Sequence, residues 1–372
     1  MKRHYDILVT DSRYKHALSI VRGLGKEGLR IATCSEGFSP TRFSKYSKKS
    51  FKYTRKNFQN KLLNFLNKND VSLVLPVGYF TNKECSKIKK EIENNSKIIL
   101  SDFHLINSIS RKDYLKKVLN KFKMLYPKTW IIKRVSDVEK IKGKNFVIKS
   151  ALEEKGKKVE YASSNKELKK FLSNRLSFGT QIVQEHISGE GRGFFAFCYK
   201  GTCLQTFQHK RIRQYPESGG VSSCAESIYD KTLEKISKGF LKKLNWTGPV
   251  MLEYIYNQEK RKYYFIEMNA KFWGSYDLSI FCGLNFGKIP FDLIKGKKIK
   301  NKKYPLGKKF QWILPEDTLR IKTSKKKSLA KKEWKRDLLD RSIGKDIQYL
   351  FNDPLPTLIR IFSTIWKYFF KK

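Results

Sequence analysis

The first hundred residues alternate short apolar runs with segments that have helical spacing of their apolar residues. The apolar runs have the length of buried strands, and they are 6–10, 28–34, 71–77 and 98–100. The segments with helical character are 16–24, 58–66 and the charged segment 83–94. Strands that alternate with helices predict a small parallel, Rossmann-like sheet. No GxGxxG motif follows any of these strands, so the pattern does not support dinucleotide binding.

The pattern changes after a basic helix predicted at 110–122, because strands then follow one another through hairpin turns. The predicted strands are 145–149, 181–187, 194–199, 203–209, 250–256 and 262–268. Two helices are predicted among them, at 167–172 and 230–244. Runs of strands with a few helices are typical of an α+β domain.

Beyond about residue 295 the chain becomes strongly basic, with dense lysine runs at 295–303 and 322–327. The end of the chain, 355–372, regains helical spacing of apolar residues. We therefore predict an α/β plus α+β protein in three parts. These are an N-terminal Rossmann-like domain at 1–108, a central domain at 109–298, and a basic C-terminal extension with a terminal amphipathic helix at 299–372.

One predicted strand carries polar side chains at alternate positions of an otherwise apolar run. Glu267, Asn269 and Lys271 are each two residues apart, so they should point to the same face. A hairpin with turn 257–261 would place Glu253 opposite Glu267, and two facing carboxylates destabilise a sheet unless a positive charge lies between them. Carboxylate and amide oxygens suit Mg²⁺ shared with nucleotide phosphates. The alternative is a solvated hairpin face whose charges are balanced by nearby lysines.

The amino-acid composition narrows the possible binding partners of the protein only in part. The chain has 372 residues and a net charge of +45, which favours polyanionic partners such as nucleic acid, anionic lipid or phosphorylated metabolites. The lysines are spread along the whole chain, however, as a general compositional bias would also produce. The six cysteines contain no CxxC pair, which indicates a reducing cytoplasm and neither a zinc site nor a disulfide framework. We find no signal peptide and no run of apolar residues long enough to span a bilayer.

Several motifs, taken in order, resemble those of ATP-grasp ligases over most of residues 1–295. They are Lys112 in SRKDY, the segment Tyr126–Thr129, Lys149 at a strand end, the segment Gln184–Glu190, the Glu253 hairpin, Glu267-Met268-Asn269-Ala270-Lys271, and Gly274-Ser275 followed by CGLNF at 282–286. The last of these, Gly274-Ser275 followed by 282–286, also looks like the carboxylate–amine ligase branch, which includes carbamoyl-phosphate-synthase-like proteins. The resemblance implies a Rossmann-like domain followed by two ATP-grasp subdomains that hold a nucleotide.

The resemblance assigns roles to matching residues of this chain. Lys112 and Lys149 would contact ATP phosphates, although either could also be a surface lysine. The adenine edge would pair with the strand that carries Gln184, Glu185 and Ile187, and the ribose with Glu190. The metal would be Mg²⁺, with Mn²⁺ as an alternative, and its ligands would be Glu253, Glu267 and Asn269.

Three basic residues are the candidates for contact with the reacting groups. Arg211 and Arg213 precede the diglycine segment 217–223, and they could clamp an acyl phosphate or a substrate carboxylate, or belong to a basic surface loop. Lys271 stands where the family has an arginine, so the positive charge is kept without the bidentate fork. The loop 150–159 has one glycine, where relatives are often richer, and its lysines could compensate by charge.

The function implied by the resemblance is an ATP- and Mg²⁺-dependent ligase that joins a carboxylate to an amine through an acyl phosphate. The alternative is a basic protein that binds nucleic acid or a membrane surface and uses the ATP-grasp fold only to bind nucleotide. Nucleic acid is disfavoured because no known binding module is recognisable. The terminal helix could attach to an anionic membrane surface or dock on its own domain. We expect a cytoplasmic protein. The alternative is a cytoplasmic protein that lies peripherally at the inner face of the membrane.

Overall fold

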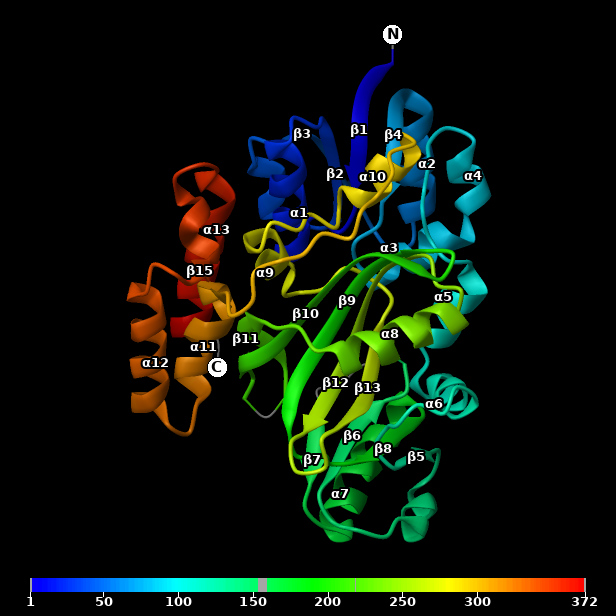
Figure 1. Ribbon diagram of the computed structural model, residues 1–372, viewed down its shortest axis with the longest axis vertical. Coiled ribbons are helices and arrows are strands. Elements are labelled where there is room, and N and C mark those ends of the chain that lie inside the picture. The colour runs from blue at the N-terminus through cyan, green and yellow to red at the C-terminus, as the bar shows by residue number, and fades with distance from the viewer. Residues whose placement is uncertain (1, 153–158, 218, 371–372) are drawn as a thin grey trace. The chain divides into compact units, whose positions relative to one another are not determined.

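The computed structural model describes residues 2–152, 159–217 and 219–370, and these form two compact units (Figure 1). Unit 1 comprises Met1–Asp102, Phe194–Met251 and Lys271–Lys372. Unit 2 comprises Phe103–Gly193 and Leu252–Ala270. The C-terminal segment therefore folds as part of unit 1. The division at residues 108 and 298 stays a prediction.

Unit 1 begins with a four-stranded parallel sheet in the order β3-β2-β1-β4. The strands are β1 Arg3–Val9, β2 Ile31–Glu36, β3 Ser47–Tyr53 and β4 Asn69–Leu75. In the central strand, Ile7 is in register with Ile31 on one side and with Leu73 on the other. All three side chains are fully buried, as expected for a parallel sheet that is covered on both faces. The predicted parallel sheet is thus present.

The helices of this part are α1 Lys15–Lys26, α2 Phe58–Lys68, α3 Tyr79–Lys87 and α4 Lys89–Glu93. The single helix predicted at 83–94 is wrong, because the chain leaves helical geometry at Ile88. The strand predicted at 98–100 is also wrong, since only Lys97 forms a bridge, to Leu73. The prediction missed β3, an edge strand whose exposed lysines hide the apolar alternation.

The second sheet of unit 1 is the portion β9-β10-β11-β14-β15 of a longer strand order. Its strands are β9 Glu190–Tyr199, β10 Thr202–Tyr215, β11 Val221–Ser227, β14 Lys309–Gln311 and β15 Gly344–Lys345. The helices are α8 Lys231–Lys243, α9 Tyr276–Phe281, α10 Ile289–Ile294, α11 Thr318–Thr323, α12 Lys327–Leu339 and α13 Pro354–Phe370. The segment predicted as a diglycine loop at 217–223 gives way to β11 from Val221, which pairs antiparallel with β10.

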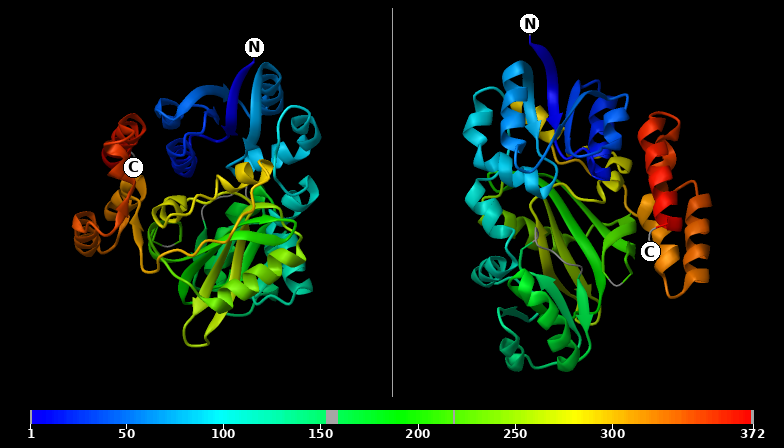
Figure 2. Two further views of the ribbon diagram at one scale, coloured as in Figure 1. Left: turned by 45° about the horizontal axis from the view of Figure 1, so that its top comes forward. Right: turned by 180° about the vertical axis from the view of Figure 1, so that it is seen from behind.

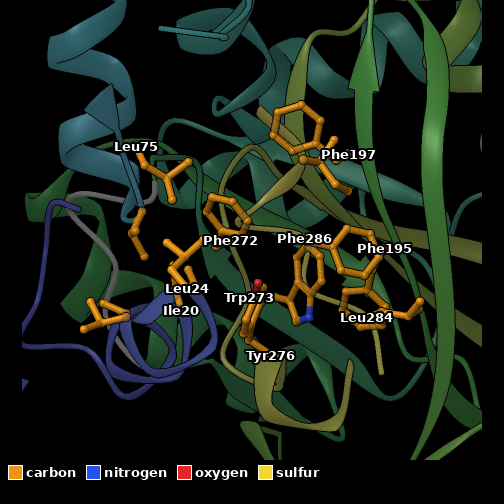
Figure 3. Close-up of a cluster of buried hydrophobic side chains, with 14 of the residues drawn as sticks. Ile20, Leu24, Leu75, Phe195, Phe197, Phe272, Trp273, Tyr276, Leu284 and Phe286 are labelled. Atoms are coloured by element: carbon orange, nitrogen blue, oxygen red, sulfur yellow. The ribbon is translucent and has the colours of Figure 1, made fainter. Parts of the chain in front are cut away.

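The core of unit 1 is rich in aromatic side chains (Figure 3). Trp273 is buried against Phe286 in an edge-to-face arrangement, with ring centroids 5.0 Å apart. Such pairs stabilise a core beyond the effect of their buried area. His209 is also fully buried here, and its ring stacks on Phe195 at 4.6 Å while Nε2 lies 3.0 Å from Ser275 Oγ.

Burial, helped by the nearby charge of Arg211, lowers the pKa of His209 from 6.5 to about 3. Between these values the unfolded chain binds a proton that the folded chain excludes, so stability falls as pH falls below 6.5. From pH 6.5 to 5 this single group should cost about 2 kcal/mol of unfolding free energy. Urea unfolding of wild type and His209→Gln at several pH values measures it. Equal pH slopes in the two proteins would contradict the assignment.

Unit 2 contains an antiparallel sheet in the order β5-β8-β6-β7. These strands are β5 Thr129–Ile132, β6 Phe146–Ser150, β7 Glu160–Ala162 and β8 Gln181–Glu185. One face packs on helix α7, Asn165–Arg175, through a small core that includes Ile148, Val183 and Leu168. The unit also holds α5 Phe103–Ile109, α6 Lys112–Lys121 and the adjacent strands β12 Gly248–Asn257 and β13 Lys262–Asn269, of which β12 begins in unit 1.

Candidate functional site

The predicted hairpin is present as β12 and β13, and its turn is closed by Asn257, whose side-chain oxygen accepts from the backbone N–H of Lys260 at 2.7 Å. At the far end of the hairpin, the amide of Asn269 donates to Glu253 Oε1 at 3.0 Å. Glu267 lies two residues before Asn269 on the same strand, so strand alternation directs both to one face. Two of the three predicted metal ligands, Glu253 and Asn269, are therefore in direct contact. Strand alternation places the third, Glu267, on the same face as Asn269.

Lys112 completes this group from a different element. It is the first residue of helix α6, and its Nζ lies 3.0 Å from Glu267 Oε1. The backbone N–H of Lys112 donates to Ala151 O at 3.0 Å, which fixes the start of the helix on the segment after β6. Both side chains are partly buried, where an ion pair is screened less than at the surface. The Glu267 carboxylate thus lies in a place that accommodates a positive charge.

Lys149 and Gln184 belong to the sheet face that points away from the small core of unit 2. Cross-strand neighbours share a face, and Lys149 is paired with Ile182 while Gln184 is paired with Val147 and Thr129. The Gln184 side chain is buried, and its amide donates to Thr129 Oγ1 at 3.1 Å. Buried core residues Ile148 and Val183 occupy the opposite face. Two predicted nucleotide contacts therefore lie on one face of the sheet.

A small pocket opens between this sheet face, helix α6 and strand β13. Its lining residues are Lys112, Lys116, Leu119, Tyr126, Thr129, Ile182, Gln184 and Ile266. Its lining combines apolar side chains with a few polar groups and two lysines, as is common in ligand pockets. The pocket meets the hairpin at Lys112, which both lines it and contacts Glu267.

The loop after β8 is held against β12. Asn257 donates to Ser188 O at 3.0 Å, and the backbone N–H of Glu185 donates to Lys128 O at 2.9 Å. The Glu185 side chain is exposed, and Ile187 is partly buried. These contacts fix the position of the segment predicted to meet the adenine. Its contact with a nucleotide stays a prediction.

Gly189, in the same loop, has no room for a side chain. A Cβ would lie 2.3 Å from Tyr256 O, and φ is +156°. We expect Gly189→Ala to lower the unfolding free energy by about 1–3 kcal/mol through overpacking. Gly239→Ala is the matched control, because its Cβ would meet nothing within 4 Å and alanine favours the helix α8 around it. Urea unfolding compares the two, and an unchanged stability of Gly189→Ala would show that the loop moves away freely.

Glu190 lies at the start of β9 and is paired with Arg192, whose Nε is 2.5 Å from Glu190 Oε1. Arg192 also donates to the Tyr263 hydroxyl and lies over the Tyr256 ring at 4.2 Å. Burial opposes the charge of this guanidinium, but the hydrogen bond to Glu190 and the Tyr263 oxygen outweigh it and raise the pKa of Arg192. Glu190 is therefore held in a fixed orientation, and its predicted contact with ribose remains untested.

The three residues predicted to act on the reacting groups all lie in unit 1. Arg213 is buried and donates to Asp317 at 2.9 Å and to Asp337, with Asp317 also accepting from Ser223. Burial opposes its charge, but these carboxylates outweigh it and raise the pKa of Arg213. These contacts give Arg213 a structural role, so the prediction that it meets a substrate has no support from its partners.

Arg211 is partly exposed and donates to Gly220 O at 3.3 Å. Gly220 is required by close packing, since a Cβ would lie 2.1 Å from Tyr215 O. Lys271 follows the end of unit 2 directly, and its charge helps to lower the pKa of His16 to about 3, after the larger effect of burial. The catalytic roles of Arg211 and Lys271 stay predictions. The lysines predicted to compensate for a glycine-poor loop, at 155, 157 and 158, lie outside the described residues.

Sequence reasoning overlooked Lys116, which lies four residues after Lys112 on the same side of α6. The i, i+4 spacing of two lysines before Leu119 was the available signal. Lys116 Nζ donates to Thr129 O at 2.6 Å. Arg192 was also overlooked. Glu190, two residues before it, was the local signal, whereas its aromatic partners lie on β12 and β13.

The donor set can be tested against the metal that was predicted. Within the described ranges, no three His, Cys, Asp or Glu side chains gather in a way that could hold a metal ion. Two carboxylates and one amide are instead the kind of incomplete oxygen set that Mg²⁺ uses when phosphates and water supply its other ligands. The ion pair from Lys112 shows that Glu267 accepts a cation. The residues present therefore fit a magnesium ion that arrives with a nucleotide.

No sequence profile of a known protein family matches this chain, and no curated protein sequence matches it. Solved structures do match. The biotin carboxylase domain of Hydrogenobacter thermophilus 2-oxoglutarate carboxylase, in complex with MgADP, ADP and bicarbonate, gives a TM-score of 0.67 at 12% identity over 82% of this chain and 73% of that one. N5-carboxyaminoimidazole synthetase from Staphylococcus aureus gives 0.65 at 11% identity, with 83% and 82% covered. An L-amino acid ligase from Bacillus licheniformis gives a TM-score of 0.60 at 14% identity, over 79% of this chain and 75% of that one.

Proposed function

Because the chain has the fold of ATP-grasp carboxylate–amine ligases, as its motifs predicted, we propose that it is an ATP- and Mg²⁺-dependent ligase that joins a carboxylate to an amine. The observation that carries the proposal is the group formed by Glu253, Asn269, Glu267 and Lys112 beside the pocket of unit 2. Proteins of this fold include structures that hold MgADP, which supports the choice of nucleotide and metal.

In the proposed reaction, a carboxylate oxygen of the substrate attacks the γ-phosphorus of ATP, and ADP leaves. The amine nitrogen then attacks the acyl carbon, phosphate leaves, and the nitrogen loses a proton. Positioning and charge neutralisation carry most of the catalysis in such phosphoryl transfers. Mg²⁺, or Mn²⁺, would be held by Glu253, Glu267 and Asn269 and would supply positive charge to the phosphates.

The chain's own residues have distinct tasks in this proposal. Lys112 and Lys149 attract the phosphates, and the apolar side chains of Ile182 and Ile266 contact the base. The segment of Gln184, Glu185 and Ile187 offers backbone groups to the adenine edge, and Glu190 meets the ribose. Arg211 and Lys271 are the proposed contacts of the acyl phosphate. We leave Arg213 out of this set because buried carboxylates hold its guanidinium.

The proposal can be tested before either substrate is known. Hydroxylamine displaces phosphate from an acyl phosphate and yields a hydroxamate, so it replaces the unknown amine. A panel of carboxylates is incubated with the full-length protein, ATP, Mg²⁺ and hydroxylamine, and both ADP and hydroxamate are measured. We expect at least one carboxylate to give both products in equal amounts. ATP binding without ADP release across a broad panel would favour the alternative, in which the fold only binds nucleotide.

A further inference from the structure

The C-terminal helix α13 packs on unit 1 through its polar side. The buried residues of the helix are Pro356, Thr357 and Thr364. Arg360, between the two threonines, donates to Leu314 O and to the carboxylate of Asp346 at 3.1 Å. The helix contacts the 3₁₀ segments Pro40–Phe43 and Asp346–Leu350. The side of α13 that faces the protein is therefore the one that carries its hydrogen-bonding groups.

The opposite side of α13 is apolar and lies outside the fold. We call its residues the α13 stripe: Leu355, Leu358, Phe362, Ile365, Trp366 and Phe369. Their spacing of three or four residues places them on one helix face. Phe362 and Phe369 are each 69% exposed and Trp366 is 58% exposed. A contiguous set of large exposed apolar side chains marks an interaction surface, because leaving it in water is unfavourable.

A helix near α13 carries exposed lysines. Helix α11 packs against both α12 and α13, and Figure 2 shows α12 in orange and α13 in red on the same side of unit 1. The exposed lysines of α12 are Lys327, Lys331, Lys332 and Lys335. Lys322 of α11 donates to Tyr368 O at 2.5 Å, near the C-terminal end of α13. Exposed positive charge therefore lies on α12, which shares its neighbour α11 with α13.

The charge distribution decides between the occupants that could cover this stripe. A second copy of the chain would bring the same lysines together across a two-fold contact, and the chain already carries a net charge of +45. An anionic lipid surface satisfies both features at once, since its acyl chains accept the aromatic and leucine side chains and its headgroups accept the lysines. The polar side of α13 stays bonded to unit 1, so the helix would lie along the surface.

Among the residues that the structure describes, no helix has both the length and the apolar character required to cross a membrane. We propose that the α13 stripe and the α12 lysines form a docking surface for an anionic lipid bilayer. Docking inserts Phe362, Trp366 and Phe369 between the headgroups while the ion pairs and hydrogen bonds that hold α13 on unit 1 remain in place. This surface is separate from the nucleotide site of unit 2 and does not depend on the ligase proposal.

Vesicle sedimentation with the full-length protein tests the docking surface. We expect wild type to bind vesicles of equal parts phosphatidylcholine and phosphatidylglycerol, and to bind phosphatidylcholine vesicles much less. Phe362→Ser/Trp366→Ser should weaken binding at least about tenfold by removing apolar insertion. Lys331→Glu/Lys332→Glu should weaken binding to the anionic vesicles alone, and added salt should have the same effect. The control is Ser363→Ala, an exposed position of the same helix outside the stripe.

Trp366 also reports insertion directly. The side chains of Trp246, Trp273 and Trp312 are buried, whereas Trp130 and Trp334 are partly buried. The share of Trp366 in the quenching by bromine-labelled acyl chains is therefore the difference between wild type and Trp366→Phe, and that variant should lose most of the quenching. Because the substituted side chains are exposed, the variants should unfold thermally at the wild-type temperature. Failure of wild type to bind anionic vesicles, or equal binding by the stripe variant, would overturn the proposal. A dimer that depends on Phe362 and Trp366, without vesicle binding, would show that a second copy covers the stripe and would overturn it as well.

Discussion

Glu267→Gln is expected to reduce ADP formation by about a hundredfold or more while leaving the fold intact. The substitution keeps the size of the side chain and removes its charge, so the proposed metal site would lose a ligand and Lys112 loses the partner that lies 3.0 Å away. Loss of one charged ligand should act mainly on the transition state, where negative charge on the phosphates must be neutralised. The measurement is the steady-state rate of ADP release with the carboxylate identified by the hydroxamate screen.

Glu259→Gln is the matched control for this experiment. Glu259 lies in the turn of the same hairpin, and its side chain is exposed. The Glu259→Gln substitution also removes one negative charge from this hairpin, and it should leave the rate of ADP release unchanged. If the Glu267→Gln protein turned over ATP at the wild-type rate, the assignment of the metal ligands would be wrong, even if the variant were less stable than wild type.

Asp353→Ala is expected to lower the unfolding free energy by about 3–5 kcal/mol, the usual cost of leaving one charge of a buried pair without its partner. Arg22 and Asp353 are each 2% exposed, and Arg22 Nε donates to Asp353 Oδ2 at 2.8 Å. Asp353 also accepts from Ser44 Oγ at 2.8 Å and from the backbone N–H of Lys45 at 3.0 Å. Arg22 donates further to Thr357 at 2.9 Å, so the pair attaches the start of α13 to α1.

Urea unfolding measures this effect, and two further variants interpret it. Arg22→Met/Asp353→Leu should recover a large part of the loss, because an apolar pair does not leave an uncompensated charge. Asp102→Ala, at an exposed aspartate of unit 1, should change stability by less than about 0.5 kcal/mol. If Asp353→Ala were as stable as Asp102→Ala, the pair would not hold α13 in place.

The parts of the site that sequence reasoning reached depend on local periodicity. Alternation along β13 placed Glu267 and Asn269 together, and the hairpin signal around Asn257 brought Glu253 to them. The apolar run into Lys149 identified β6 and the face that it shares with Ile182. The parallel sheet of unit 1 followed from the same logic, because buried parallel strands are continuous apolar runs.

What sequence reasoning missed depends on partners far along the chain. Arg213 was predicted as a site residue because it alternates with Arg211 before the diglycine segment, whereas its partners in the structure are the distant Asp317 and Asp337. For α13, helical periodicity alone could not show which side faces the protein. Arg360 turns inward because Asp346 and Leu314 O accept its hydrogen bonds there, and Thr357 accepts from Arg22 on the same side.

The most direct test of the central claim is calorimetric titration of the full-length protein with ATP, in the presence and absence of Mg²⁺. We predict that Mg²⁺ strengthens ATP binding to wild type, because Glu253 and Glu267 repel bare phosphates and would hold a metal ion that neutralises this repulsion. In Glu253→Gln/Glu267→Gln the effect of Mg²⁺ should disappear, and metal-free ATP should bind at least as well as it does to wild type. Absence of ATP binding under both conditions, or an equal effect of Mg²⁺ in the two proteins, would contradict the account.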